Sequence, residues 1–169
     1  MSERPPELSE LSEHHRIKAL LPQRHPLLLV DRVVSVRPGH SLSAVKAVTA
    51  AEPCYRDVPD GAPASAYAYP ASLLLESLGQ AAALLWLAEA GAIGPDHVLM
   101  FAGARGYRLL GEAHPGDVLR HDVEMTQVKA DTVFATGQTY AGSTLIATAD
   151  TLIAVRRPRS VLEPATISQ

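Results

Sequence analysis

The feature that most constrains this sequence is a segment of about twenty residues that would be apolar on nearly every side of a helix. The segment PASLLLESLGQAAALLWLAEAG begins at Pro70 and ends at Gly91. Proline suits the first turn of a helix and glycine commonly follows the last one, so the two residues mark its ends. A helix that is apolar all round must be enclosed by protein. We therefore expect a buried helix from about residue 71 to about residue 89.

The rest of the chain favours strands over further long helices. Two segments with alternating or continuous apolar residues precede the helix, joined by a turn at Pro38-Gly39, and about four follow it, joined by turns at 115–117, 129–131 and 141–143. This order indicates an α+β fold in which an antiparallel sheet of about six strands wraps one long central helix. Because such a sheet has an open edge, we expect two copies to associate as a dimer.

At 169 residues the chain fits one domain. We expect the folded domain to span residues 13–157, with a disordered, Pro-containing N-terminus at 1–12 and a C-terminal tail at 158–169. The stretch between Glu52 and Pro70 is dense in Pro, Gly and Asp. A loop of this length within a compact domain is either functional or mobile.

Composition argues against several classes of function. The net charge of −3 and the pI of about 6.1 provide no basic field for nucleic acid. A single cysteine, Cys54, excludes an internal disulfide, and no Cys/His pairs stand at the spacing of a structural zinc site. The N-terminus lacks the apolar core of a signal peptide, and the apolar helix carries Glu76, Gln80 and Glu89. We expect a cytoplasmic protein that binds neither nucleic acid nor membrane.

Five blocks of sequence, taken in order, resemble the beta-hydroxyacyl-acyl-carrier-protein dehydratases of the hotdog fold. They are LLPQRHPLLLVDRV at 20–33, AVTAAEP at 47–53, PASLLLESLGQAA at 70–82, FAGARGYRL at 101–109 and HPGDVLRHDVEM at 114–125. The resemblance covers roughly residues 17 to 156. It implies a hotdog fold and a role in fatty-acid or polyketide biosynthesis. It also implies an acyl carrier protein with a phosphopantetheine-bound acyl chain as partner, and chemistry that needs no metal or organic cofactor.

In that family a histidine on the loop before the central helix faces a carboxylate on the helix of the other subunit. Loss of water from a beta-hydroxyacyl thioester needs a base for the alpha proton and an acid for the departing hydroxyl. The resemblance places the carboxylate at Glu76, with Gln80 one turn along as its orienting neighbour. The backbone N–H of Ala71 would polarise the thioester carbonyl, and Tyr67 and Tyr69 would line the mouth of the substrate tunnel. The candidate catalytic residues are therefore Glu76 and Gln80.

The chain departs from the family at the histidine. The segment EPCYRDVPDG has Asp57 or Val58 where the family has that histidine, and no histidine occurs between His40 and His97. His121 falls in an alternating strand and reads as a packing residue.

This departure leaves three hypotheses. The first is that the chain is the histidine-lacking subunit of a heteromeric dehydratase, whose histidine comes from a homologous partner in a hotdog dimer. The second is an acyl thioesterase in which Glu76 activates water or attacks the carbonyl, which needs no histidine. The third is a non-catalytic hotdog protein that binds acyl chains or scaffolds a biosynthetic complex.

Overall fold

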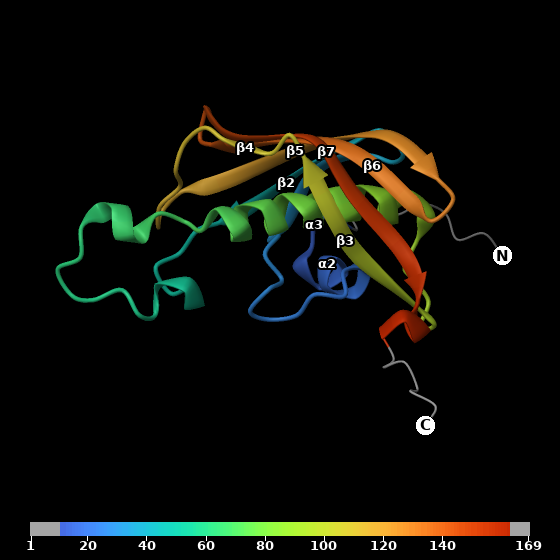
Figure 1. Cartoon of the computed structure of the whole chain (residues 1–169), viewed down its shortest axis with the longest axis horizontal. Coiled ribbons are helices and arrows are strands. Elements are labelled where there is room, and N and C mark those ends of the chain that lie inside the picture. Colours follow the sequence, from blue (N-terminus) through green and yellow to red (C-terminus); the bar gives the residue numbers. More distant parts are fainter. Residues whose placement is uncertain (1–10, 163–169) are drawn as a thin grey trace, which may run out of the picture.

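A single antiparallel sheet curves over one long helix (Figure 1). The computed structural model describes residues 11–162 of the chain. The helices are α2 (His14–Leu20) and α3 (Ala71–Ala90), with short 3-10 turns η1 (Pro53–Tyr55), η2 (Ala64–Tyr67) and η3 (Arg159–Leu162). The strands are β1 (Arg32–Arg37), β2 (Ser41–Ala47), β3 (His97–Arg105), β4 (Arg108–Leu109), β5 (Val118–Lys129), β6 (Thr132–Ala141) and β7 (Thr144–Pro158).

The sheet follows the order β1-β2-β5-β6-β7-β3, with the short β4 paired to β7, and all of these pairings are antiparallel. The expected α+β hotdog architecture is confirmed. The sheet has seven strands where the sequence suggested about six. The first of the strands expected after the helix, VLMFAGARGYRLL at 98–110, is split into β3 and β4, because the backbone turns at Gly106 with a φ of +60° that favours glycine.

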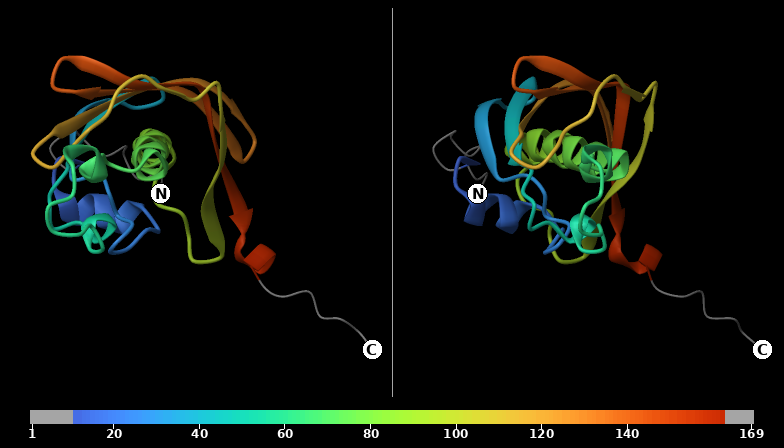
Figure 2. Two further views of the ribbon diagram at one scale, coloured as in Figure 1. Left: turned by 60° about the vertical axis from the view of Figure 1, so that its left-hand side comes forward. Right: turned by 90° about the vertical axis from the view of Figure 1, so that its left-hand side faces the viewer.

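Helix α3 lies inside the curve of the sheet. Seen along its axis, α3 occupies the centre, the sheet arches over it, and α2 lies below it (Figure 2, left). The helix starts directly after Pro70 and ends at Gly91, whose φ is +79° and whose N–H is donated to the carbonyl of Leu87. Segment 64–90 is apolar and long enough to cross a membrane, but 72% of its most apolar window is buried inside the fold. A helix that is buried to this extent by the rest of the fold is a core helix.

The strands against α3 bury alternate side chains, as their sequence pattern predicts. In β5 the buried residues include Leu119, His121 and Val123, and β2 buries Leu42 and Ala44 in the same way. The sequence analysis read His121 only as a packing residue, and the structure places it wholly inside the core with no exposed surface.

Two glycines allow α3 and the sheet to approach closely. A Cβ at Gly137 of β6 would lie 3.0 Å from a side-chain carbon of Leu78 and 2.9 Å from one of Leu152. A Cβ at Gly79 would lie 3.2 Å from the ring of Phe101 in β3. These contacts restrict where the helix can sit.

The expected domain limits fall close to the ends of the described segment. Most of the N-terminus expected to be disordered lies outside the described residues, but Leu11 is described and is buried in the core. At the other end β7 reaches Pro158 and η3 continues to Leu162, while residues 163–169 lie outside the description. The domain limits stay a prediction.

Candidate active site

The carboxylate of Glu76 is held by two side-chain amides. Its Oε1 accepts a hydrogen bond from Gln80 Nε2 at 2.9 Å and another from Gln23 Nε2 at 3.2 Å. Within residues 11–162, no hydrogen bond is made to its Oε2. Glu76 is half-buried on a helix whose next twelve residues, 77–88, are all buried. One oxygen of Glu76 is therefore held by two amides, while the other makes no hydrogen bond within the described residues.

Gln80 fixes the chain around this carboxylate. Its side chain is 1% exposed. Its Nε2 also donates to the carbonyl of Leu27 at 2.6 Å, and its Oε1 accepts the N–H of Leu29 at 2.9 Å. The amide thus joins α3 to the segment that leads into β1. This arrangement suits the orienting role expected for Gln80.

Sequence reasoning missed Gln23. It lies 53 residues before Glu76, in the irregular segment between α2 and β1, and no helical or strand period relates the two positions. Its Oε1 is buried and has no hydrogen-bond partner among the described residues. Only the path of the segment, set by Gln80, brings Gln23 to the carboxylate.

The three residues expected to bind substrate lie at the start of α3 and just before it. Ala71 is exposed as the first residue of the helix. Tyr67 is half-buried in η2, with its ring centroid 6.0 Å from that of Tyr55. Tyr69 is buried, and its desolvation, together with the charge of Glu52, raises the pKa of its phenol. A role of these residues in substrate binding stays a prediction.

The loop at residues 52–70, where the family carries its histidine, leads into α3 and holds no histidine in this chain. Val58 is half-buried and packs on a cluster that includes Tyr55, whereas Asp57 is exposed. The chain has seven histidines, all within residues 11–162, and none forms a hydrogen bond or ion pair with Glu76. His25 belongs to the same segment as Gln23, but it is exposed.

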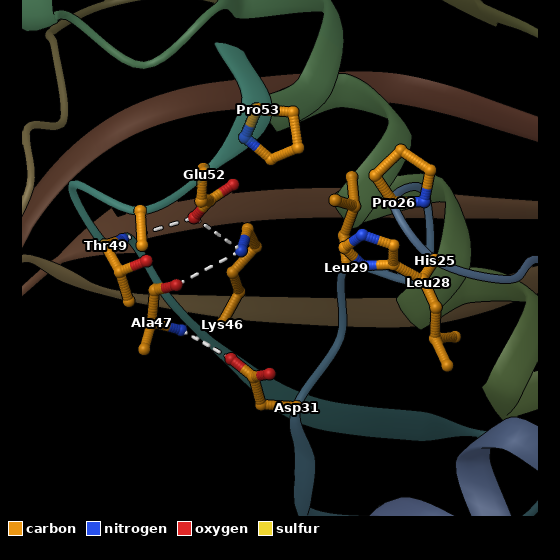
Figure 3. Close-up of a pocket in the computed structure, with 11 residues that line it drawn as sticks. His25, Pro26, Leu28, Leu29, Asp31, Lys46, Ala47, Thr49, Glu52 and Pro53 are labelled. Carbon is orange, nitrogen blue, oxygen red and sulfur yellow. Dashed lines mark hydrogen bonds and ion pairs between the residues drawn. The ribbon is translucent and has the colours of Figure 1, made fainter. Parts of the chain in front are cut away.

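A groove of about 440 Å³ is lined by the segment from His25 to Asp31 and by residues 46–53 (Figure 3). His25 and Pro26 stand on one side of it, and the ion pair between Lys46 and Glu52 stands on the other (Figure 3). Lys46 Nζ lies 2.9 Å from Glu52 Oε1 and donates to the carbonyl of Ala47 at 3.1 Å, while both charged side chains are largely buried. The pair links the end of β2 to the start of η1. Glu76 does not line this groove, and we assign the pair a structural role.

Comparison with known proteins agrees with this architecture. The model of the FabA-like domain matches residues 21–150. The 3-hydroxyacyl-acyl-carrier-protein dehydratase FabZ of Actinobacillus pleuropneumoniae serotype 5b is 33% identical over 151 residues, which cover 89% of this chain and 94% of the relative.

Solved structures share the fold at lower identity. The structure of the dehydratase heterocomplex ApeI:P from Xenorhabdus doucetiae matches with a TM-score of 0.69 and 16% identity, over 86% of this chain and 93% of that chain. A thioesterase superfamily member from Thermus thermophilus matches with a TM-score of 0.56 and 15% identity, over 76% of this chain and 89% of that chain. At these identities the structural matches speak for the fold, whereas the family model and the FabZ relative cover most of the sequence. The chain belongs to the beta-hydroxyacyl-acyl-carrier-protein dehydratase family of the hotdog fold.

Proposed function

We propose that this chain is the histidine-lacking subunit of a heteromeric dehydratase that acts on beta-hydroxyacyl chains carried by acyl carrier protein. The observation that supports it most is the state of Glu76, whose Oε1 is held by Gln80 and Gln23 while Oε2 is unengaged within residues 11–162. Dehydration by such an acid needs a base as its counterpart, and none of the described histidines forms a hydrogen bond or ion pair with Glu76.

Glu76 is the general acid of the proposed reaction. Since Oε1 accepts two N–H donors, the proton of the neutral acid resides on Oε2. The partner's base removes the alpha proton from C2, the C2–H electron pair forms the double bond, and the C3–O bond breaks as Oε2 protonates the hydroxyl. The products are an enoyl thioester and water. Glu76 is left ionised and the base protonated, and return of that proton completes the cycle.

The proposed pairing follows from how the family divides its site between subunits. A chain with the carboxylate and no histidine completes one site per dimer when its partner supplies the histidine. The free edge of β3 supports association, since β3 pairs only with β7 among the described strands. Leu73, Leu75 and Glu76 are also only half-buried on the first turns of a helix whose residues 77–88 are all buried. The structurally similar ApeI:P is described as a dehydratase heterocomplex, which supports the proposal of a heteromeric assembly.

In this proposal the N-terminal end of α3 binds the carbonyl of the substrate thioester. The N–H groups of its first turn have no helical acceptor, and they carry the positive end of the helix dipole. The N–H of Ala71 would polarise a thioester carbonyl placed there, and Tyr67 and Tyr69 would line the mouth of the tunnel. The acyl chain arrives on phosphopantetheine from the carrier protein, in the reducing cytoplasm, as part of fatty-acid or polyketide synthesis.

The test is dehydration of a beta-hydroxyacyl-carrier-protein substrate, followed by mass spectrometry. The protein is assayed alone and after co-expression with a histidine-bearing dehydratase from the same genome. We expect turnover only in the pair, lowered at least 100-fold by Glu76→Gln, since removing a general acid costs roughly 10²–10⁴ in rate. Glutamine keeps a carbonyl oxygen for both amide donors, so the site geometry is retained while the proton is lost.

Glu89→Gln is the matched control, because Glu89 is exposed near the end of the same helix. Turnover by the wild-type protein alone would contradict the shared site. Release of free acid from the carrier, lost in Glu76→Gln, would replace the proposal with the thioesterase hypothesis. Absence of both products in every combination would favour the acyl-binding or scaffolding role.

A further inference from the structure

Three polar side chains form a sealed hydrogen-bonded chain beside Glu76. Ser77 of α3, His121 of β5 and Thr139 of β6 each have 0% relative exposure. Ser77 Oγ lies 2.7 Å from His121 Nε2, and His121 Nδ1 lies 2.9 Å from Thr139 Oγ1. The three residues therefore tie the helix that carries Glu76 to two central strands.

The hydrogen-bonded side chains of Ser77, His121 and Thr139 cannot exchange protons with a substrate. Burial, with a smaller effect from the charge of Lys46, lowers the pKa of His121 to about 3. The imidazole is therefore neutral at pH 7, and it donates to one hydroxyl and accepts from the other. With no exposed atom in the three side chains, no proton can leave for solvent or substrate.

Apart from this network, α3 packs on the sheet through apolar contacts, which unlike hydrogen bonds have no preferred geometry. The buried residues from position 81 to 85 are alanines and leucines, whose packing has no preferred direction, and the close approaches at Gly79 and Gly137 limit the helix only by volume. Among residues 11–162, the bond from Ser77 to His121 is the only side-chain hydrogen bond between α3 and a strand. Because each helical residue adds 1.5 Å of rise and 100° of rotation, a shift of a fraction of a residue would displace the neighbouring Glu76 carboxylate.

We propose that Ser77, His121 and Thr139 form a positioning network that fixes α3 along and around its axis and so places Oε2 of Glu76 for reaction. The inference rests on the proposed function of Glu76. It makes Ser77 and His121 positioning residues, since neither touches substrate. A network of this kind selects one packing arrangement more than it adds stability.

The variant that separates positioning from stability replaces all three residues together. Ser77→Ala, His121→Leu and Thr139→Val, combined, leave no orphaned polar group and nearly conserve volume, so the triple variant should fold with stability close to wild type. Together with the histidine-bearing partner we expect its kcat to fall at least tenfold while KM changes less than twofold. Thr139→Val alone keeps the Ser77–His121 bond and should retain most of the turnover.

Thr148→Val is the matched control, because the Thr148 hydroxyl is buried without a hydrogen-bond partner among the described residues. Wild-type kcat in the triple variant would overturn the proposal. So would an equal loss of turnover in Thr148→Val.

A second readout does not depend on catalysis. The side-chain amide of Gln80 bonds to both Glu76 and Leu27, so its two NMR signals report whether the helix holds one position. We expect one sharp pair in the wild type, and broadened or doubled signals in the triple variant. If the wild-type protein together with its histidine-bearing partner shows no dehydration, the proposed function fails. The spectrum still tests whether the network holds α3 in one position. A single sharp pair in the triple variant would contradict it.

Discussion

Gln80 makes hydrogen bonds to two separate parts of the chain, and this predicts what its removal does. In Gln80→Leu the carbonyl of Leu27 and the N–H of Leu29 lose their partner inside the protein. Since an orphaned buried polar group costs about 1–3 kcal/mol, we expect a loss of about 2–4 kcal/mol in the free energy of unfolding, measured with urea. Gln23→Leu removes a single 3.2 Å bond from a half-buried residue and should cost less than about 1 kcal/mol. Equal losses of stability in the two variants would contradict the conclusion that Gln80 joins α3 to the segment leading into β1.

His121 predicts a dependence of stability on pH. Its pKa in the folded protein is about 3, below its ordinary value of 6.5, so the unfolded chain binds the additional proton as the pH falls below 6.5. This residue's contribution to stability is complete above that pH and decreases by up to about 1.4 kcal/mol per pH unit below it. Lys46 is the charged group that acts on His121.

The measurement is urea unfolding of the wild type and of the triple Ser77, His121 and Thr139 variant between pH 7.5 and pH 5. The difference in stability between the two proteins should change with pH, in favour of the variant at low pH. A constant difference would show that His121 remains neutral in the unfolded chain or is charged in the folded one.

At the scale of elements, the contact between α3 and β6 depends on the lack of a side chain at Gly137. In Gly137→Ala the added Cβ would press on Leu78 and Leu152 at 3.0 Å and 2.9 Å. We expect a loss of about 1–3 kcal/mol, the usual range for overpacking, observed as a lower melting temperature. Gly94→Ala is the control, because a Cβ there meets nothing within 4 Å. A Gly137→Ala variant as stable as Gly94→Ala would mean that the helix can move away from the sheet without cost.

The elements were largely predictable from sequence, and the contacts between them were not. Pro70, Gly91 and the apolar run between them define α3 to within a residue, because they are local signals. Glu76 and Gln80 meet as helical spacing requires. Gln23 reaches Glu76 from an irregular segment, and no period in the sequence encodes such a contact.

His121 is a case in which the sequence held a signal that the interpretation did not use. It occupies an inward position of an alternating strand, between Leu119 and Val123, so its burial followed from the pattern. A buried histidine requires partners. The pairing with Ser77 and Thr139, however, depends on how β5, β6 and α3 are stacked, which the sequence pattern of each element alone does not determine.

At the scale of the whole molecule, we propose that this chain supplies only the acid and depends on a partner for the base. Introducing a histidine should therefore remove the need for that partner. Val58 is half-buried in the loop before α3, whereas the neighbouring Asp57 is exposed. We expect Val58→His to give dehydration by this protein alone, provided that two copies associate, because each copy then contributes both groups. The same mass-spectrometric assay measures it, and Asp57→His, which places histidine on an exposed position, should remain inactive. Activity in neither variant, with normal folding, would place the missing base elsewhere in the loop.

The hydrogen bonds around Gln80 also bear on how such a chain would change over many generations without selection for catalysis. The bonds from Gln80 to Leu27 and Leu29 do not involve Glu76, so the fold would tolerate replacement of the carboxylate far better than replacement of the amide. A descendant that had abandoned the reaction would therefore lose Glu76 early and keep Gln80. This chain has both Glu76 and Gln80, and it has no histidine between His40 and His97. Since the fold itself does not require Glu76, the presence of this carboxylate beside an intact Gln80 supports the acid role that we propose for it.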